Sequence, residues 1–178
     1  MIRFATLAAA AVMALAAAAV MALAAPVAAA VPPAPVQTAA DPGLSPEAVR
    51  AWLTAKGGTV SEIRSEGGET WLTVADGPLN WMVFFYGCQA GVCGDIQYAA
   101  SFSNPTINEA MVNVWNRDHR FLKAFFAPGE GGGDQTAVVQ YDVLLHSADV
   151  EQLTDHTALW LDLVAEFGRT VGYFAPAQ

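Results

Sequence analysis

The chain has 178 residues, with 17 acidic and 8 basic side chains and a formal net charge of −9 at pH 7. This negative charge disfavours nucleic acids and anionic lipids as partners, because both present phosphate groups. All five tryptophans lie between Trp52 and Trp160, and this aromatic content excludes a largely disordered chain.

The N-terminus has the pattern of a secretory signal peptide. Arg3 precedes an apolar run from Phe4 to Leu23, and Ala28-Ala29-Ala30 supplies small residues for cleavage before Val31, with Ala22-Leu23-Ala24 as an alternative site. A membrane anchor is the other interpretation, because the run approaches the ~20 residues that span a bilayer, but alanine is only weakly apolar. We expect a periplasmic or secreted protein that keeps no stable membrane anchor once the signal is cleaved.

Three segments are predicted from these boundaries. Residues 1–30 form the signal peptide, residues 31–43 form a flexible leader rich in alanine and proline, and residues 44–175 form one domain. A domain of this length buries one core and is too short for two domains of ordinary size.

The first half of the domain predicts one helix and four strands. Ser45, Pro46 and Glu47 supply the cap, first-turn proline and first-turn acid of a helix that Gly57-Gly58 ends. The strands that follow are predicted at Thr59–Arg64, Glu69–Ala75, Asn80–Tyr86 and Asp95–Phe102. The third of these is apolar on both faces, which is typical of a central strand.

The second half predicts a helix, a hairpin and a closing helix. A capping box of Thr106 and Glu109 starts the helix, which we expect to end at Asp118 or His119. Two strands, Leu122–Ala127 and Thr136–Leu145, flank a glycine-rich loop, and Asp149 caps the long last helix. The order α-β-β-β-β-α-β-β-α predicts an α+β fold with an antiparallel sheet of about six strands and three helices.

Three segments resemble the YbjN family of bacterial domains. They are residues 81–93 (WMVFFYGCQAGVC), residues 115–121 (WNRDHRF) and the closing helix with Trp160. The family is named for regulators of sensory transduction, and its fold is similar to class I type III secretion chaperones, in which helices back a curved antiparallel sheet. The resemblance covers residues 44–174 and implies neither enzymatic activity nor a cofactor.

Cys88 and Cys93 flank a short turn, and in an exported chain this favours a structural disulfide. Their spacing is not the Cys-x-x-Cys of redox pairs, and no nearby histidine completes a zinc site. His119, His146 and His156 lie in separate predicted elements without the spacing of metal ligands. The sequence also lacks the G-x-S-x-G, H-E-x-x-H and phosphate-loop motifs, so no catalytic site is predicted.

Two features predict partner binding. Asn116, Arg117 and Arg120 cluster at the end of a helix, where the cations either satisfy terminal carbonyls or anchor a partner. The strand from Trp81 to Tyr86 leaves aromatic side chains exposed if all helices cover the other sheet face, whereas both faces are buried if the helices divide or the sheet curls. The residues predicted to contact a protein or peptide partner, or a second copy, are Trp81, Phe85, Trp115, Asn116, Arg117 and Arg120.

Two other functions remain open at this point. A small envelope hydrolase requires His119 or His146 beside a carboxylate in a cleft. A self-associating structural protein requires a large, flat apolar patch with two-fold self-complementarity.

Overall fold

The computed structural model describes residues 42–129 and 134–175, all of which belong to the second of two units, Thr38–Gln178. The predicted signal peptide, nearly all of the leader and residues 130–133 of the glycine-rich loop lie outside the described residues.

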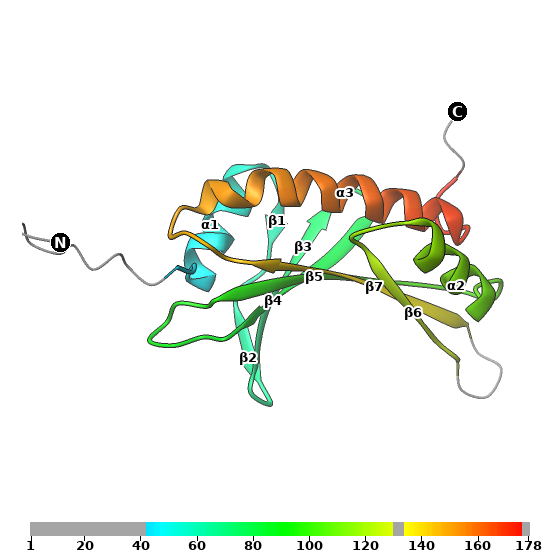
Figure 1. The fold of residues 1–178 in the computed structure, drawn as a ribbon, viewed down its shortest axis with the longest axis horizontal. Coiled ribbons are helices and arrows are strands. Elements are labelled where there is room, and N and C mark those ends of the chain that lie inside the picture. Colours follow the sequence, from blue (N-terminus) through cyan, green and yellow to red (C-terminus); the bar gives the residue numbers. More distant parts are fainter. Residues whose placement is uncertain (1–41, 130–133, 176–178) are drawn as a thin grey trace, which may run out of the picture. The chain divides into compact units, whose positions relative to one another are not determined.

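One antiparallel sheet of seven strands organises the described residues, with the order β1-β3-β4-β5-β7-β6 and β2 paired to β3. Helices α1, α2 and α3 all lie on the same side of this sheet (Figure 1). The α+β class is therefore confirmed. The elements are α1 (Pro46–Ala55), β1 (Thr59–Val60), β2 (Arg64–Glu66), β3 (Glu69–Asp76), β4 (Leu79–Tyr86), β5 (Asp95–Asn104), α2 (Glu109–Asp118), β6 (Lys123–Ala127), β7 (Gln135–Leu144), the 3-10 turn η2 (Val150–Gln152) and α3 (Leu153–Thr170).

The seventh strand arises because the predicted strand Thr59–Arg64 is interrupted. The hydroxyl of Ser61 accepts a hydrogen bond from the backbone N–H of Thr73, which replaces regular ladder pairing and separates β1 from β2. The β2–β3 turn is shorter than predicted, because Gly67 and Gly68 alone form it with φ angles of 62° and 89°. Glycine adopts such angles without steric cost, and they suit a two-residue hairpin turn.

The start of α1 and the end of α2 at Asp118 agree with prediction, whereas the starts of α2 and α3 differ from it. Ser45 caps α1 by accepting a hydrogen bond from the N–H of Ala48 at 3.1 Å. The predicted cap of α2 at Thr106 is wrong, because Asn108 accepts from the N–H of Met111 and the helix begins at Glu109. Asp149 caps the short η2 turn, so α3 itself begins only at Leu153.

The core lies between α3 and the helix-facing side of the sheet. The apolar stripe expected along the last helix is buried at Leu153, Trp160, Val164, Phe167 and the C-cap Val171, all at 0% exposure, whereas Leu161 of the same stripe is only partly buried. The ring of Trp160 packs on Trp81 of β4 and Tyr98 of β5, with ring centroids 5.9 Å and 5.8 Å away. This aromatic cluster fixes α3 across the centre of the sheet.

Gly168 allows the C-terminal segment to fold back on α3, and its replacement by alanine should destabilise the domain. A Cβ at this position would lie 2.5 Å from the ring of Phe174. Overpacking should outweigh the gain in helix propensity from alanine, so the free energy of unfolding measured in urea should fall by about 1 kcal/mol. In a Phe174→Ala background the same change should be neutral or stabilising. Equal effects in both backgrounds would contradict this account.

Tyr98 should make the domain sensitive to alkaline pH. Burial raises the pKa of its hydroxyl, and the hydrogen bond to Thr157 at 2.8 Å offsets only part of that effect. Because the pKa is higher in the folded state, the contribution to stability is complete below about pH 10 and falls as pH rises further, by about 1.4 kcal/mol per pH unit. Between pH 9 and 11.5, the free energy of unfolding measured in urea should fall less steeply with pH for Tyr98→Phe than for wild type. Parallel declines would refute this assignment.

Candidate functional site

The side of the sheet opposite the helices is an open face. Alternate side chains of a strand point to opposite sides, so Trp81, Val83 and Phe85 of β4 enter the core, whereas Met82 and Phe84 point away from it. Within the described residues, no helix covers this second side (Figure 1). Of the two arrangements that the sequence left open for β4, the structure has the one with a bare face.

A row of aromatic side chains crosses the open face. Trp71 of β3 is paired with Phe84 of β4, and their ring centroids lie 6.3 Å apart. Phe84 in turn stacks on Tyr86, with centroids 6.4 Å apart. The larger apolar side chains of this face are Trp71, Met82, Phe84, Tyr86, Phe125, Val138 and Leu144, and its alanines are Ala75, Ala99 and Ala127. Exposed apolar surface spread over neighbouring strands is typical of an interaction site.

A hollow of about 360 Å³ lies beside this row. The small side chains of Ala99 and Ser101 on β5 belong to its lining, with Met82 and Phe84 on one side and Val138 on the other. Because small residues stand between larger ones, the face is grooved along β5. This volume is at the lower end of ligand pockets, so the hollow suits one bulky apolar side chain of a partner.

A cluster of three polar side chains, Gln97, Lys123 and Asp142, borders the apolar surface. The Gln97 amide and the Lys123 ammonium group donate hydrogen bonds to Asp142 at 2.5 Å and 2.9 Å. Burial alone would raise the pKa of Asp142, but these two hydrogen bonds outweigh it and hold the pKa below its ordinary value. The carboxylate is therefore charged at neutral pH.

Acidic groups also surround Tyr86 at the end of the aromatic row. Burial, followed by the nearby carboxylates of Glu69, Asp142 and Asp95, raises the pKa of its hydroxyl. The open face thus combines an apolar centre with a largely acidic border.

Three of the six residues predicted to contact a partner are buried instead. Trp81, Phe85 and Trp115 are 2%, 3% and 1% exposed. The two β4 residues have the parity that faces the helices, and the indole of Trp115 donates a hydrogen bond to the carbonyl of Leu122 inside the domain. None of the three can contact a partner without unpacking the core, so their predicted role is corrected.

The other three predicted residues are exposed but do not form one cluster of interactions. The guanidinium of Arg117 donates two hydrogen bonds to the neighbouring Asp118, and that of Arg120 lies 4.8 Å from the ring centroid of Phe121. The side-chain amide of Asn116 makes two hydrogen bonds with the backbone of Ala124 in β6. The structure therefore provides no shared anchor of these three side chains.

His119 meets only part of the requirement for a hydrolase. Its Nε2 lies 3.3 Å from a carboxylate oxygen of Glu166 on α3. Its ring stacks on Trp115 of α2, with ring centroids 3.6 Å apart, so the imidazole packs on the end of α2. The hollow on the open face is lined by other residues. Among residues 42–129 and 134–175, no group of three or more His, Cys, Asp or Glu side chains could hold a metal ion.

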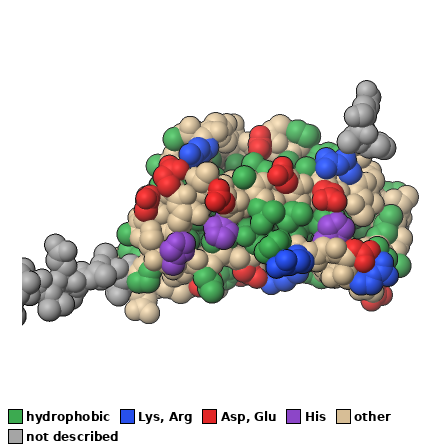
Figure 2. Space-filling model, turned by 45° about the horizontal axis from the view of Figure 1, so that its top comes forward, with side chains coloured by type: hydrophobic (Ala, Val, Ile, Leu, Met, Phe, Trp, Pro, Cys, Tyr) green, Lys and Arg blue, Asp and Glu red, His purple; other side chains and the backbone are tan. Residues whose placement is uncertain are grey.

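The helix-covered side of the domain carries mixed charges. Figure 2 shows acidic, basic and histidine side chains interspersed on it, with no large field of one sign. In the described part of the chain, no helix has the length and apolar character needed to cross a membrane.

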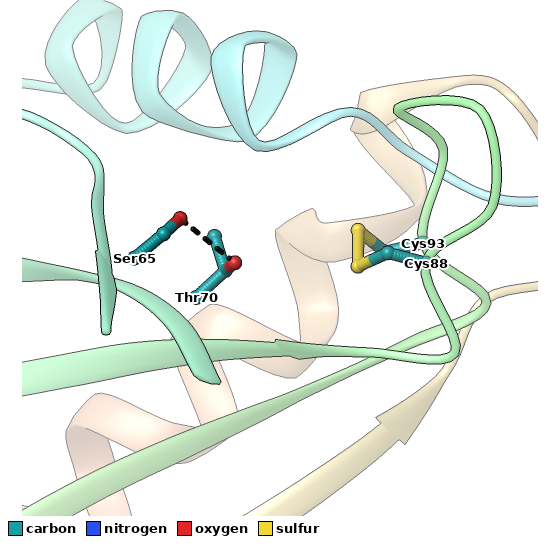
Figure 3. Close-up of a disulfide and its surroundings, with 4 residues drawn as sticks. All are labelled: Ser65, Thr70, Cys88 and Cys93. Carbon is teal, nitrogen blue, oxygen red and sulfur yellow. Dashed lines mark hydrogen bonds between the residues drawn. A yellow bond between two sulfur atoms is a disulfide. The ribbon is translucent and has the colours of Figure 1, made fainter. Parts of the chain in front are cut away.

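A disulfide joins Cys88 and Cys93 at the end of the β4–β5 hairpin (Figure 3). Between them, Ala90 and Gly91 form a tight turn with φ angles of 50° and 84°. Cys93 also exchanges two backbone hydrogen bonds with Leu44, the residue before the cap of α1. The bonded hairpin therefore holds the start of the domain in place.

Comparison with known proteins identifies the family. The family model described as "YbjN: Putative bacterial sensory transduction regulator" matches residues 45–172. The chain belongs to the YbjN family. The crystal structure of YbjN from E. coli, described there as "a putative transcription regulator", is 14% identical, covers 71% of this chain and 87% of that one, and has a TM-score of 0.44. No curated protein matches significantly.

Sequence reasoning missed the YbjN-domain residues that do face outward on β3 and β4, namely Trp71, Met82, Phe84 and Tyr86. Their signal was the register of the β3–β4 hairpin. Asp76 pairs with Leu79, so the apolar pair Leu72 and Val83 shares one face and Trp71 and Phe84 share the other.

Proposed function

We propose that this YbjN domain is an exported, non-catalytic regulatory module that binds a protein or peptide partner on the open face of its sheet. The observation that supports this most directly is the row of Trp71, Phe84 and Tyr86 beside a hollow, on a face that no described helix covers. Such side chains contribute large contact area at low entropic cost and dominate many protein interfaces.

The charge of the border indicates the chemistry of the partner. Glu69, Asp95 and Asp142 lie near the aromatic row, and the whole chain has a net charge of −9. A segment with a bulky apolar residue flanked by lysine or arginine would complement this face. Binding should accordingly weaken as the salt concentration rises.

Export is the second part of the proposal. The Arg3 start, the alanine-rich run and the cleavage site before Val31 support a signal peptide, and the disulfide suits an oxidising compartment. The test is cell fractionation with mass determination of the recovered protein. We expect a chain that begins near Val31 outside the cytoplasm. An uncleaved chain in the cytoplasm would refute export without affecting the proposed binding face.

Site-specific photocrosslinking in the producing cells tests the binding face. A benzoylphenylalanine at position 84 should link the domain to a defined partner, whereas the same group at Val114, an exposed residue of α2, should not. Equal products from both positions would contradict the proposal. A product of twice the chain's mass would instead support the self-associating alternative.

A further inference from the structure

Among the described strands, none pairs with the outer edge of β6. β6 is the last strand of the sheet, and it pairs with β7 on one side only (Figure 1). In an antiparallel strand, the backbone groups of alternate residues point to the same side. Because Ala124 directs its N–H and C=O away from β7, Leu122 and Phe126 direct theirs outward as well.

Two side chains from α2 occupy most of this edge. The amide of Asn116 donates to the carbonyl of Ala124 and accepts from its N–H, both at 2.8 Å. This is the pair of hydrogen bonds that a neighbouring strand would make. The indole N–H of Trp115 bonds to the carbonyl of Leu122 at 3.1 Å. In the described part of the chain, only Phe126 among these positions has outward backbone groups without a hydrogen bond.

We infer that Asn116 closes the edge of β6 against a second copy of this chain. An uncovered edge strand is a template for pairing, and natural proteins block such edges. The segment from Leu122 to Ala127 has two phenylalanines, one charge and no proline or glycine, which is the composition of a self-pairing strand. Two copies of this edge complement each other in antiparallel orientation, because each offers the same donors and acceptors.

This inference is independent of the open face. Asn116 is assigned to the control of self-association at the edge of β6. The proposed partner binds elsewhere, on the open face opposite the helices. Failure of one proposal therefore leaves the other standing.

Hydrogen exchange of the wild-type protein gives a first test that needs no variant. The amide of Ala124 should exchange as slowly as the β6 amides that pair with β7, although it points outward. The amide of Phe126, which points in the same direction, should exchange at least tenfold faster. Equal rates for the two amides would overturn the inference.

The second test compares Asn116→Ala with Asn113→Ala in the full chain. Asn113 is exposed three residues earlier on α2, and among the described residues its side chain makes no hydrogen bond. In Asn116→Ala, the Ala124 amide should exchange roughly tenfold faster, and the mass by light scattering should rise with protein concentration. Asn113→Ala should behave as wild type.

Asn116→Asp separates edge closure from loss of fold. The carboxylate keeps an acceptor for the Ala124 N–H but places a negative charge at the edge, so this variant should not self-associate. If both Asn116 variants have the circular dichroism of wild type and neither the exchange rate nor the mass changes in Asn116→Ala, the inference is wrong. If Asn116→Ala does not fold, the wild-type exchange rates decide.

Discussion

Phe85→Ala is expected to lower the free energy of unfolding by about 3 to 5 kcal/mol, whereas Phe84→Ala should cost only about 1 kcal/mol. The two residues are adjacent in β4, but Phe85 is 3% exposed beneath the helices and Phe84 lies on the open face. Urea unfolding of the two purified variants measures the difference. Similar losses would show that the open face is covered in the folded protein.

The losses of affinity for the partner should follow the opposite order to the losses of stability. Phe84→Ala should reduce affinity by tenfold or more, because aromatic anchors at the centre of an interface carry much of the binding energy. Phe85→Ala should retain affinity at a temperature where it remains folded. Since the two variants remove the same side chain from neighbouring positions, each is the matched control for the other.

Loss of the disulfide should have the next largest effect. Replacing both Cys88 and Cys93 with alanine opens a short loop, and the chain-entropy model gives a cost of roughly 2 kcal/mol for a loop of this size. The hairpin would also hold Leu44 less firmly, because Cys93 makes two backbone hydrogen bonds with it. Unfolding should therefore shift to lower urea, and the amides of Leu44 and Cys93 should lose protection from hydrogen exchange.

Wild-type protein treated with a reducing agent is the control for this double variant. It should show the same loss of stability and the same change in exchange. A loss confined to the variant would mean that the alanines themselves perturb the hairpin.

The sequence allowed prediction of the element order because the local signals agree with the final structure. Ser45 and Pro46 mark the start of α1, and the buried stripe of α3 follows the helical spacing of Leu153, Trp160 and Val164. The start of α2 was missed because Thr106 and Asn108 both have capping chemistry. Asn104 accepts hydrogen bonds from Thr106, and this turn moves the helix start to Glu109.

The site residues were harder to predict than the fold because both sides of β4 are apolar. Trp81 and Phe84 differ only in parity, and composition does not show which parity the helices cover. The role of Asn116 depends on β6 lying beside α2, a tertiary contact that no local pattern reports. The WNR segment stands out as a motif in the sequence, but its contacts depend on the tertiary structure.

The alternation along β4 places the requirements for folding and for the proposed partner binding on different residues of the same strand. Substitutions at positions 82, 84 and 86 change the surface offered to a partner, while 81, 83 and 85 continue to hold the helices. If the proposed binding face holds, its specificity can change without loss of the scaffold. A library randomised at the outward positions of β3, β4 and β5 should yield mostly folded proteins, from which binders of new segments can be selected.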